Sequence, residues 1–200
     1  MTTTTTLLKQ TPSQTVGPFF AYGLTAEQYG YGYTSAYMPV LAEPRAKGEA
    51  IELVGQVFDG KGVPIADAVI EISQLDSTGQ AITTRQQAEE TGFTGFGRCG
   101  TGFDKHQRFH FRTVKPGAEA ADEAPVINVI VLMRGLLVHA FTRVYFDDES
   151  AANSKDKVLK SVPEERRPTL VAKREELPGG VRYTFDIHMQ GPQETVFFDL

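Results

Sequence analysis

The pattern of apolar and polar positions divides the chain into an irregular N-terminal segment and a strand-rich remainder. Over residues 1–49 the apolar residues show no sustained period, and glycine and proline recur where they interrupt helix and strand alike. From residue 50 onward, short runs rich in β-branched and aromatic residues alternate with turn residues. We predict a single domain over residues 1–200, with an extended arm over 1–49 followed by a β-sandwich over 50–200.

Seven segments show the composition and alternation expected of β-strands. They are residues 50–58, 68–74, 108–114, 126–133, 136–146, 181–189 and 194–199. The first ends at Asp59-Gly60, a hairpin-type turn, which predicts that residues 68–74 pair back onto it. Seven short strands joined by turns indicate an all-β fold, a two-sheet antiparallel β-sandwich.

The same pattern predicts one short helix and long loops. Residues 150–159 follow the acidic run Asp147–Glu149 and contain lysines near their end, which suits a helix dipole and accounts for the acids. Residues 80–105 are too polar and too rich in glycine for a core segment, so we predict a long loop there. Loops of that length are usually functional or bound to a partner.

Composition narrows the function classes. The 200 residues carry 25 acidic and 20 basic side chains, a net charge of −5, which argues against nucleic acid as a partner. The N-terminal residues lack the apolar run of a secretory signal, and residues 126–133 are too few to span a bilayer, so we expect no membrane association. A single cysteine, Cys99, excludes an intrachain disulfide and suits a reducing cytoplasm.

Two cysteine-containing patterns are weak signals for chemistry. Gly95–Gly100 matches the spacing G-x-G-x-x-G, but polar residues precede it and no helix pattern follows, so we interpret the match as coincidental. Cys99 and His106 could form a thiol nucleophile with its base, but a lone cysteine is more often inert.

The histidines and tyrosines have structural and metal-binding interpretations. His106 and His110 share one face of a predicted strand but lie about 13 Å apart, too far to bind one metal. His139 and His188 fall in apolar segments, which favours structural roles. Five tyrosines fall within residues 22–37. They could be phenolate ligands of ferric iron, but packing and hydrogen bonding are favoured.

Arg134 stands at the end of the apolar run 126–133, directly before Gly135. A guanidinium at such a bend could bind a carboxylate ligand with two parallel hydrogen bonds. A surface salt bridge to an acidic side chain of the chain explains the same position equally well. The spacing leaves both interpretations open.

Seven blocks, in order along the chain, resemble one family. They are Thr11–Pro18, Gly55–Gly60, Thr113–Gly117, Thr142–Glu149, Thr169–Arg174, Phe185–Ile187 and Glu194–Leu200. Together they resemble the alpha subunits of intradiol ring-cleavage dioxygenases, non-haem Fe(III) enzymes. The resemblance covers nearly all of the chain from residue 9 onward. It implies a two-sheet antiparallel sandwich, in agreement with the strand pattern.

The resemblance also implies that this chain binds no metal and has no catalytic residue of its own. The family's catalytic chains hold Fe(III) through two tyrosines and a His-x-His pair. Here the matching strand has Ile127 and Val129 at the two histidine positions. The tyrosines are expected near Arg85 and within residues 118–123, where no tyrosine occurs. Since isoleucine and valine offer no lone pair, the resemblance assigns the iron to a beta subunit.

By the same resemblance, this chain completes the substrate pocket of its beta partner in a larger assembly of alpha–beta heterodimers. The substrates are protocatechuate and O2, and the product is 3-carboxy-cis,cis-muconate. The substrate-binding residues implied for this chain are Thr15, Gly17, Pro18, Phe19 and Arg134. Phe19 replaces the tyrosine usual at its position, so a hydroxyl contact is missing there.

Two other functions are compatible with parts of the pattern. One is a stand-alone transthyretin-like β-sandwich binding module without activity, although such a module would seldom carry an arm as long as residues 1–49. The other is a self-sufficient dioxygenase that uses different iron ligands.

Overall fold

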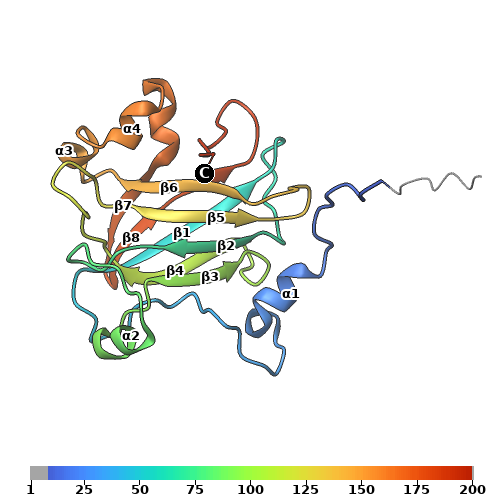
Figure 1. Ribbon diagram of the computed structural model, residues 1–200, viewed down its shortest axis with the longest axis horizontal. Helices are drawn as coiled ribbons and strands as arrows, with labels where there is room; N and C mark the ends of the chain where they lie inside the picture. Colours follow the sequence, from blue (N-terminus) through green and yellow to red (C-terminus); the bar gives the residue numbers. More distant parts are fainter. Residues whose placement is uncertain (1–8, 200) are drawn as a thin grey trace, which may run out of the picture.

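One strongly curved β-sheet forms the body of the molecule in the computed structural model, which describes residues 9–199 (Figure 1). Its strand order is β3-β2-β5-β6-β7-β8-β1-β4, with β9 beside β1. The strands are β1 Ala50–Phe58, β2 Val69–Ser73, β3 Phe96–Gly100, β4 Arg108–Val114, β5 Ile127–Leu132, β6 Ala140–Phe146, β7 Val171–Leu177, β8 Gly180–Thr184 and β9 Ile187–His188. The α-helices are α1 Phe20–Leu24, α2 Arg85–Thr91, α3 Ser150–Asn153 and α4 Lys157–Ser161, and the 3-10 helices are η1 Ala26–Tyr29 and η2 Glu164–Leu170.

The sheet is nearly closed and barrel-like, so the prediction of a two-sheet antiparallel sandwich is correct only in its β class. The two end strands contact each other, and the His110 amide of β4 donates a hydrogen bond to the Cys99 thiol of β3 over 3.4 Å. Three strand pairs are parallel: β1 with β8, β1 with β9, and β6 with β7. The alternation of apolar and polar residues shows only that each strand has one buried face. Sandwiches and barrels both have this property, so the sequence pattern could not distinguish the two folds.

The predicted hairpin between residues 50–58 and 68–74 is wrong. β1 pairs with β4 and β8, whereas β2 pairs with β3 and β5. The turn signal itself is real, because the Asp59 carboxylate accepts hydrogen bonds from the amides of Lys61 and Val63. The returning chain makes only one bridge, Phe58 to Pro64, before it crosses to the other side of the sheet.

The helix predicted over residues 150–159 is broken into α3 and α4 at Ser154–Asp156. α3 ends at Asn153, and Asp156 caps α4, since its carboxylate accepts a hydrogen bond from the Leu159 amide at 2.8 Å. The predicted long loop over 80–105 contains α2, started by a capping box of Thr84 and Gln87, and β3. β3 was not predicted because two of its buried residues, Gly97 and Gly100, have no apolar side chain to contribute to the alternation.

The ends of the chain also differ from the pattern. β7 was absent from the predicted strands, and residues 194–199 form only one isolated bridge, from Phe198 to Phe141. Over the described part of the predicted arm, α1 and η1 interrupt an otherwise irregular path. Its last part attaches to the sheet, where the Leu41 amide donates to the Arg112 carbonyl at 2.8 Å. The arm therefore reaches the barrel beside β4.

A turn before β4 gives the fold a pH-dependent contribution. The Arg108 guanidinium donates two hydrogen bonds to the Asp104 carboxylate, at 3.1 and 3.2 Å, and lowers the pKa of Asp104 from 3.8 to about 2. A lowered carboxyl pKa stabilises the fold above pH 3.8, and this stabilisation is lost as the pH falls through about 2. Because the two side chains are 31% and 39% exposed, we expect about 1 kcal/mol.

Asp104→Asn is therefore expected to lower the free energy of unfolding by about 1 kcal/mol at pH 7 and by clearly less near pH 2, where the Asp104 carboxyl is partly protonated in the folded state. Urea unfolding at the two pH values measures the difference. Asp122→Asn is the matched control, because Asp122 pairs with Lys157 through two well-exposed side chains and should matter little. A loss of the same size at both pH values would show that the ion pair is not its cause.

Candidate functional site

The arm and the bend between β5 and β6 meet at Thr15. The Gly135 amide donates a hydrogen bond to the Thr15 hydroxyl at 2.8 Å, across 120 residues of sequence. Gly135 has φ +91°, a conformation that favours glycine and shapes the bend directly after Arg134. We call residues 15–19 together with the bend residues 134–138 the arm–bend site. The structure thus brings Thr15 beside Arg134, two residues predicted separately from distant parts of the chain.

Arg134 is held by an ion pair that uses one edge of its guanidinium. Its Nε donates to the Asp67 carboxylate, while the side chain remains 55% exposed. This is the salt bridge that the sequence left as an alternative. The pair engages Nε, so the outer edge formed by the two terminal Nη groups can donate to a second carboxylate. The same contact that neutralises Arg134 in part also orients it.

The other predicted residues of the arm lie on the surface. Gly17, Pro18 and Phe19 are exposed, and the Phe19 side chain is 74% exposed at the start of α1. Its ring lies 5.7 Å from that of Tyr22. At the bend, Leu137 and Val138 are 63% and 75% exposed. Large apolar side chains therefore stand exposed on both parts of the arm–bend site.

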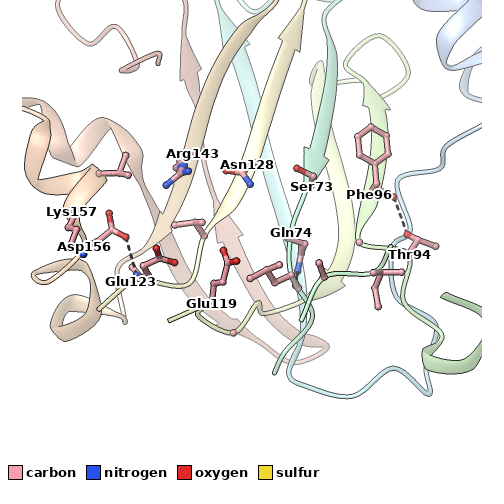
Figure 2. Close-up of a pocket in the computed structure, with 18 residues that line it drawn as sticks. Ser73, Gln74, Thr94, Phe96, Glu119, Glu123, Asn128, Arg143, Asp156 and Lys157 are labelled. Atoms are coloured by element: carbon pink, nitrogen blue, oxygen red, sulfur yellow. Dashed lines mark hydrogen bonds between the residues drawn. The ribbon is translucent and has the colours of Figure 1, made fainter. Parts of the chain in front are cut away.

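The strand expected to carry the iron ligands points those two positions into the core. Ile127 and Val129 are 0% and 1% exposed and belong to the main hydrophobic cluster. Asn128 points to the opposite face of β5. Together with Val126, just before the strand, it lines a cleft of about 520 Å³ (Figure 2). None of these four side chains is a histidine.

The two segments expected to carry tyrosine ligands lie in different parts of the structure. Arg85 starts the exposed helix α2, with a side chain 91% exposed. Glu119 and Glu123, from the second place, line the same cleft as Asn128. Across residues 9–199, no three side chains of His, Cys, Asp or Glu gather closely enough to hold a metal ion. With Ile127 and Val129 at the two positions expected for histidine, the side chains of β5 do not fit the iron centre that the resemblance implies.

Cys99 and His188 pack within the fold. The thiol is buried, and burial raises its pKa. The hydrogen bond that the Gln28 side-chain amide donates to the sulfur at 3.3 Å acts to lower the pKa, but burial outweighs it, so the thiol is enclosed rather than poised as a nucleophile. His188 stacks on Phe58 with ring centroids 4.9 Å apart. His139 was expected in an apolar strand; it lies instead in the exposed bend before β6.

The tyrosines of the arm pack against one another. The Tyr22 ring meets Tyr29 edge-on at 4.4 Å and lies 6.2 Å from Tyr31. The preference for packing over iron ligation is consistent with this arrangement.

Sequence reasoning missed two features of the charged surface. Asp67, the partner of Arg134, carries no local signal because the contact joins residues 67 apart. The acidic run at 147–149 was explained by the helix start alone, but Lys115 donates to the carboxylates of Asp148 and Glu149, each at 2.7 Å. Burial lowers the pKa of Lys115, but these carboxylates outweigh it and raise the pKa. The acidic run therefore also forms ion pairs with Lys115, which follows β4.

Comparison with known proteins gives one consistent picture. Residues 34–136 match the sequence profile of a family described as "Dioxygenase". The chain is 61% identical over 196 residues to a protocatechuate 3,4-dioxygenase alpha chain from Burkholderia cepacia, covering 98% of this chain and all of that one. It is 43% identical to the alpha chain from Pseudomonas putida, over 96% of this chain and 98% of that one.

Two more distant comparisons extend the picture. A protocatechuate 3,4-dioxygenase beta chain from Burkholderia cepacia is 27% identical over 161 residues, covering 74% of this chain and 67% of that one. The dioxygenase domain of a dioxygenase carbohydrate-binding protein fusion from Streptomyces sp. SirexAA-E superposes with a TM-score of 0.61 at 21% identity. That superposition covers 82% of this chain and 94% of the domain, and it shows a shared fold.

Proposed function

Because this chain belongs to the dioxygenase family that contains the protocatechuate 3,4-dioxygenase alpha chains, we propose that it is the alpha subunit of such an enzyme. The observation that carries the proposal is identity of 61% over 98% of the chain to a relative of that name, with no part of the relative left over. The fold supports it, since a dioxygenase domain shares the same barrel-like sheet. A stand-alone transthyretin-like binding module leaves this full-length identity unexplained.

The partner in this proposal is a beta subunit that holds the Fe(III). Three observations support this division: Ile127 and Val129 fill the core, Asn128 faces the cleft, and residues 118–123 contain no aromatic side chain. The metal chemistry, when iron is bound there, inserts both atoms of O2 into protocatechuate and opens the ring between its hydroxyl-bearing carbons. The product is 3-carboxy-cis,cis-muconate. No step of that chemistry is assigned to a residue of this chain.

The contribution of this chain is to bind and enclose the substrate. The terminal nitrogens of Arg134, oriented by Asp67, bind the carboxylate of protocatechuate at the mouth of the beta subunit's site. Thr15, Gly17, Pro18 and Phe19 form a wall of the pocket, fixed next to Arg134 by the Thr15–Gly135 hydrogen bond.

The exposed apolar side chains of the arm–bend site support a covering partner. Phe19, Leu137 and Val138 are each more than 60% exposed, and such groups are usually covered in a stable protein complex. We place the alpha–beta pairs in a larger assembly, as the family resemblance implies. No helix within residues 9–199 is long and apolar enough to cross a membrane. We assign the enzyme to the cytoplasm, which suits the single reduced cysteine.

Reconstitution tests the proposal. This chain and its beta partner are purified separately and mixed at increasing ratios, and O2 uptake is measured with protocatechuate. We expect activity to rise with added alpha chain and to saturate at one alpha chain per beta chain. Activity that is complete without this chain, or absent in the saturated mixture, would contradict the proposal.

A further inference from the structure

A second polar recess lies on the barrel wall, away from the arm–bend site. It is the cleft of about 520 Å³ introduced above, which we call the β5 cleft. Figure 2 shows Phe96, Ser73, Asn128 and Arg143 side by side across four strands, facing the same side of the sheet. The pairing explains the row, because Ser73 is opposite both Phe96 and Asn128, and Asn128 is opposite Arg143. Cross-strand partners share one face.

Two side chains of this row lack the partners that their chemistry requires. The Asn128 Oδ1 atom is buried and has no hydrogen-bond partner among residues 9–199. A buried polar atom left without a partner is costly and needs an explanation. Arg143 is half-buried and its guanidinium lies beside the neutral Tyr145 hydroxyl, but none of the carboxylates described in the structure forms an ion pair with it. A half-buried guanidinium usually has an anionic partner.

The acidic side chains of the cleft do not supply that partner. The Asp156 carboxylate accepts the Leu159 amide at 2.8 Å, the Tyr145 hydroxyl at 3.0 Å and the Ala124 amide at 3.1 Å. It is thus committed to the fold. Glu119 and Glu123 are exposed at the rim, where solvent and salt screen their charge.

The lysine of the cleft is committed as well. Lys157 pairs with Asp122 at 2.7 Å, and its side chain is 81% exposed. Arg143 is therefore the cation available to a ligand inside the β5 cleft.

The remaining walls are apolar. Leu75, Ile82, Phe96, Val126 and Val158 line the cleft around the polar row. A volume of this size suits a small organic molecule, with apolar walls for its body and a few polar groups to fix its orientation. Gln74, which also lines the cleft, already donates to the Val114 carbonyl at 2.8 Å and is not available.

We propose that the β5 cleft is a binding site of the alpha chain for a small aromatic monocarboxylate that also carries a hydroxyl group. The carboxylate binds the Arg143 guanidinium, the hydroxyl donates a hydrogen bond to the Asn128 Oδ1 atom, and the ring packs on Ile82 and Phe96. The site is built from this chain alone. It is distinct from the arm–bend site, which lies at the bend between β5 and β6 and uses a different arginine.

Calorimetric titration of the assembled alpha–beta enzyme with 4-hydroxybenzoate tests the proposal. The beta subunit's own site is expected to bind this probe, so two sites per alpha–beta pair are expected in the wild type. Arg143→Gln should weaken one of them by about 10- to 100-fold, the loss expected for a hydrogen-bonded charge pair. The other site and the kcat/KM for protocatechuate should be unchanged. One site per pair in the wild type, or two equal sites in the variant, would overturn the proposal.

A second variant keeps the test decisive if Arg143→Gln does not assemble. Asn128→Asp leaves Arg143 in place but puts a carboxylate opposite it, which should occupy the guanidinium and abolish the same site. Lys157→Gln is the matched control, because it removes a charge from the rim and should leave both sites intact. 4-Hydroxybenzyl alcohol, which lacks the carboxylate, should not bind the β5 cleft, and equal binding of the alcohol would contradict carboxylate recognition.

Discussion

Replacing Arg134 by alanine is expected to raise the KM of the assembled enzyme for protocatechuate by about 10- to 100-fold and to leave kcat within about twofold. The guanidinium binds the carboxylate, which is remote from the carbons that react. The interaction is therefore the same in the ground state and in the transition state, and its loss appears in KM. Steady-state O2 uptake at varied protocatechuate concentration measures both constants.

Three comparisons make this result specific to Arg134. Arg134→Lys keeps the charge but loses the paired donors, so its KM should lie between those of the wild type and Arg134→Ala. Asp67→Asn removes the partner that orients the guanidinium and should raise KM by a smaller factor. Arg85→Ala, on exposed helix α2, should change nothing. An unchanged KM in Arg134→Ala would remove this residue from the pocket.

Replacing Gly55 by alanine is expected to lower the free energy of unfolding by more than about 4 kcal/mol, or to prevent folding. A Cβ atom at residue 55 would lie 1.7 Å from the Phe185 carbonyl oxygen and 2.6 Å from Phe109 Cζ. The carbonyl belongs to backbone that is fixed by the hydrogen bond from the Phe185 amide to the Val54 carbonyl at 2.9 Å. Neither β1 nor the link between β8 and β9 can move away without opening the barrel.

Gly23→Ala is the matched control for Gly55→Ala. A Cβ atom at residue 23 has nothing within 4 Å, and the residue lies in α1, where alanine is favoured over glycine. Thermal unfolding of the two variants should show a large loss for the first and no loss for the second. A melting temperature of Gly55→Ala close to that of the wild type would show that the close packing at residue 55 is wrong.

Strands could be predicted where apolar and polar residues alternate over several positions. The bounds of β1 and β4 match the predicted segments 50–58 and 108–114. The pairing of these two strands could not be predicted, because it joins segments more than 50 residues apart. β3 was missed since buried glycines carry no apolar signal, and α2 was missed because none of its residues is buried.

The arm–bend site could be predicted in part. The position of Arg134 at the end of an apolar run left open a carboxylate-binding guanidinium and a surface salt bridge, and the structure shows a salt bridge to Asp67 with the Arg134 side chain half-exposed. The approach of Thr15 to Gly135 and of Asp67 to Arg134 depends on the tertiary fold. The β5 cleft gave no sequence signal, because Ser73, Asn128 and Arg143 become neighbours only when their strands pair.

The iron content of the two separately purified chains tests the central claim most directly. The account predicts that this chain alone is colourless and free of iron, that iron and visible absorbance go with the beta chain, and that activity needs both. Ile127, Val129 and Asn128 offer no imidazole where the family requires one, so added Fe(III) should not bind there. One equivalent of iron in the isolated chain, with ring-cleaving activity, would contradict the account.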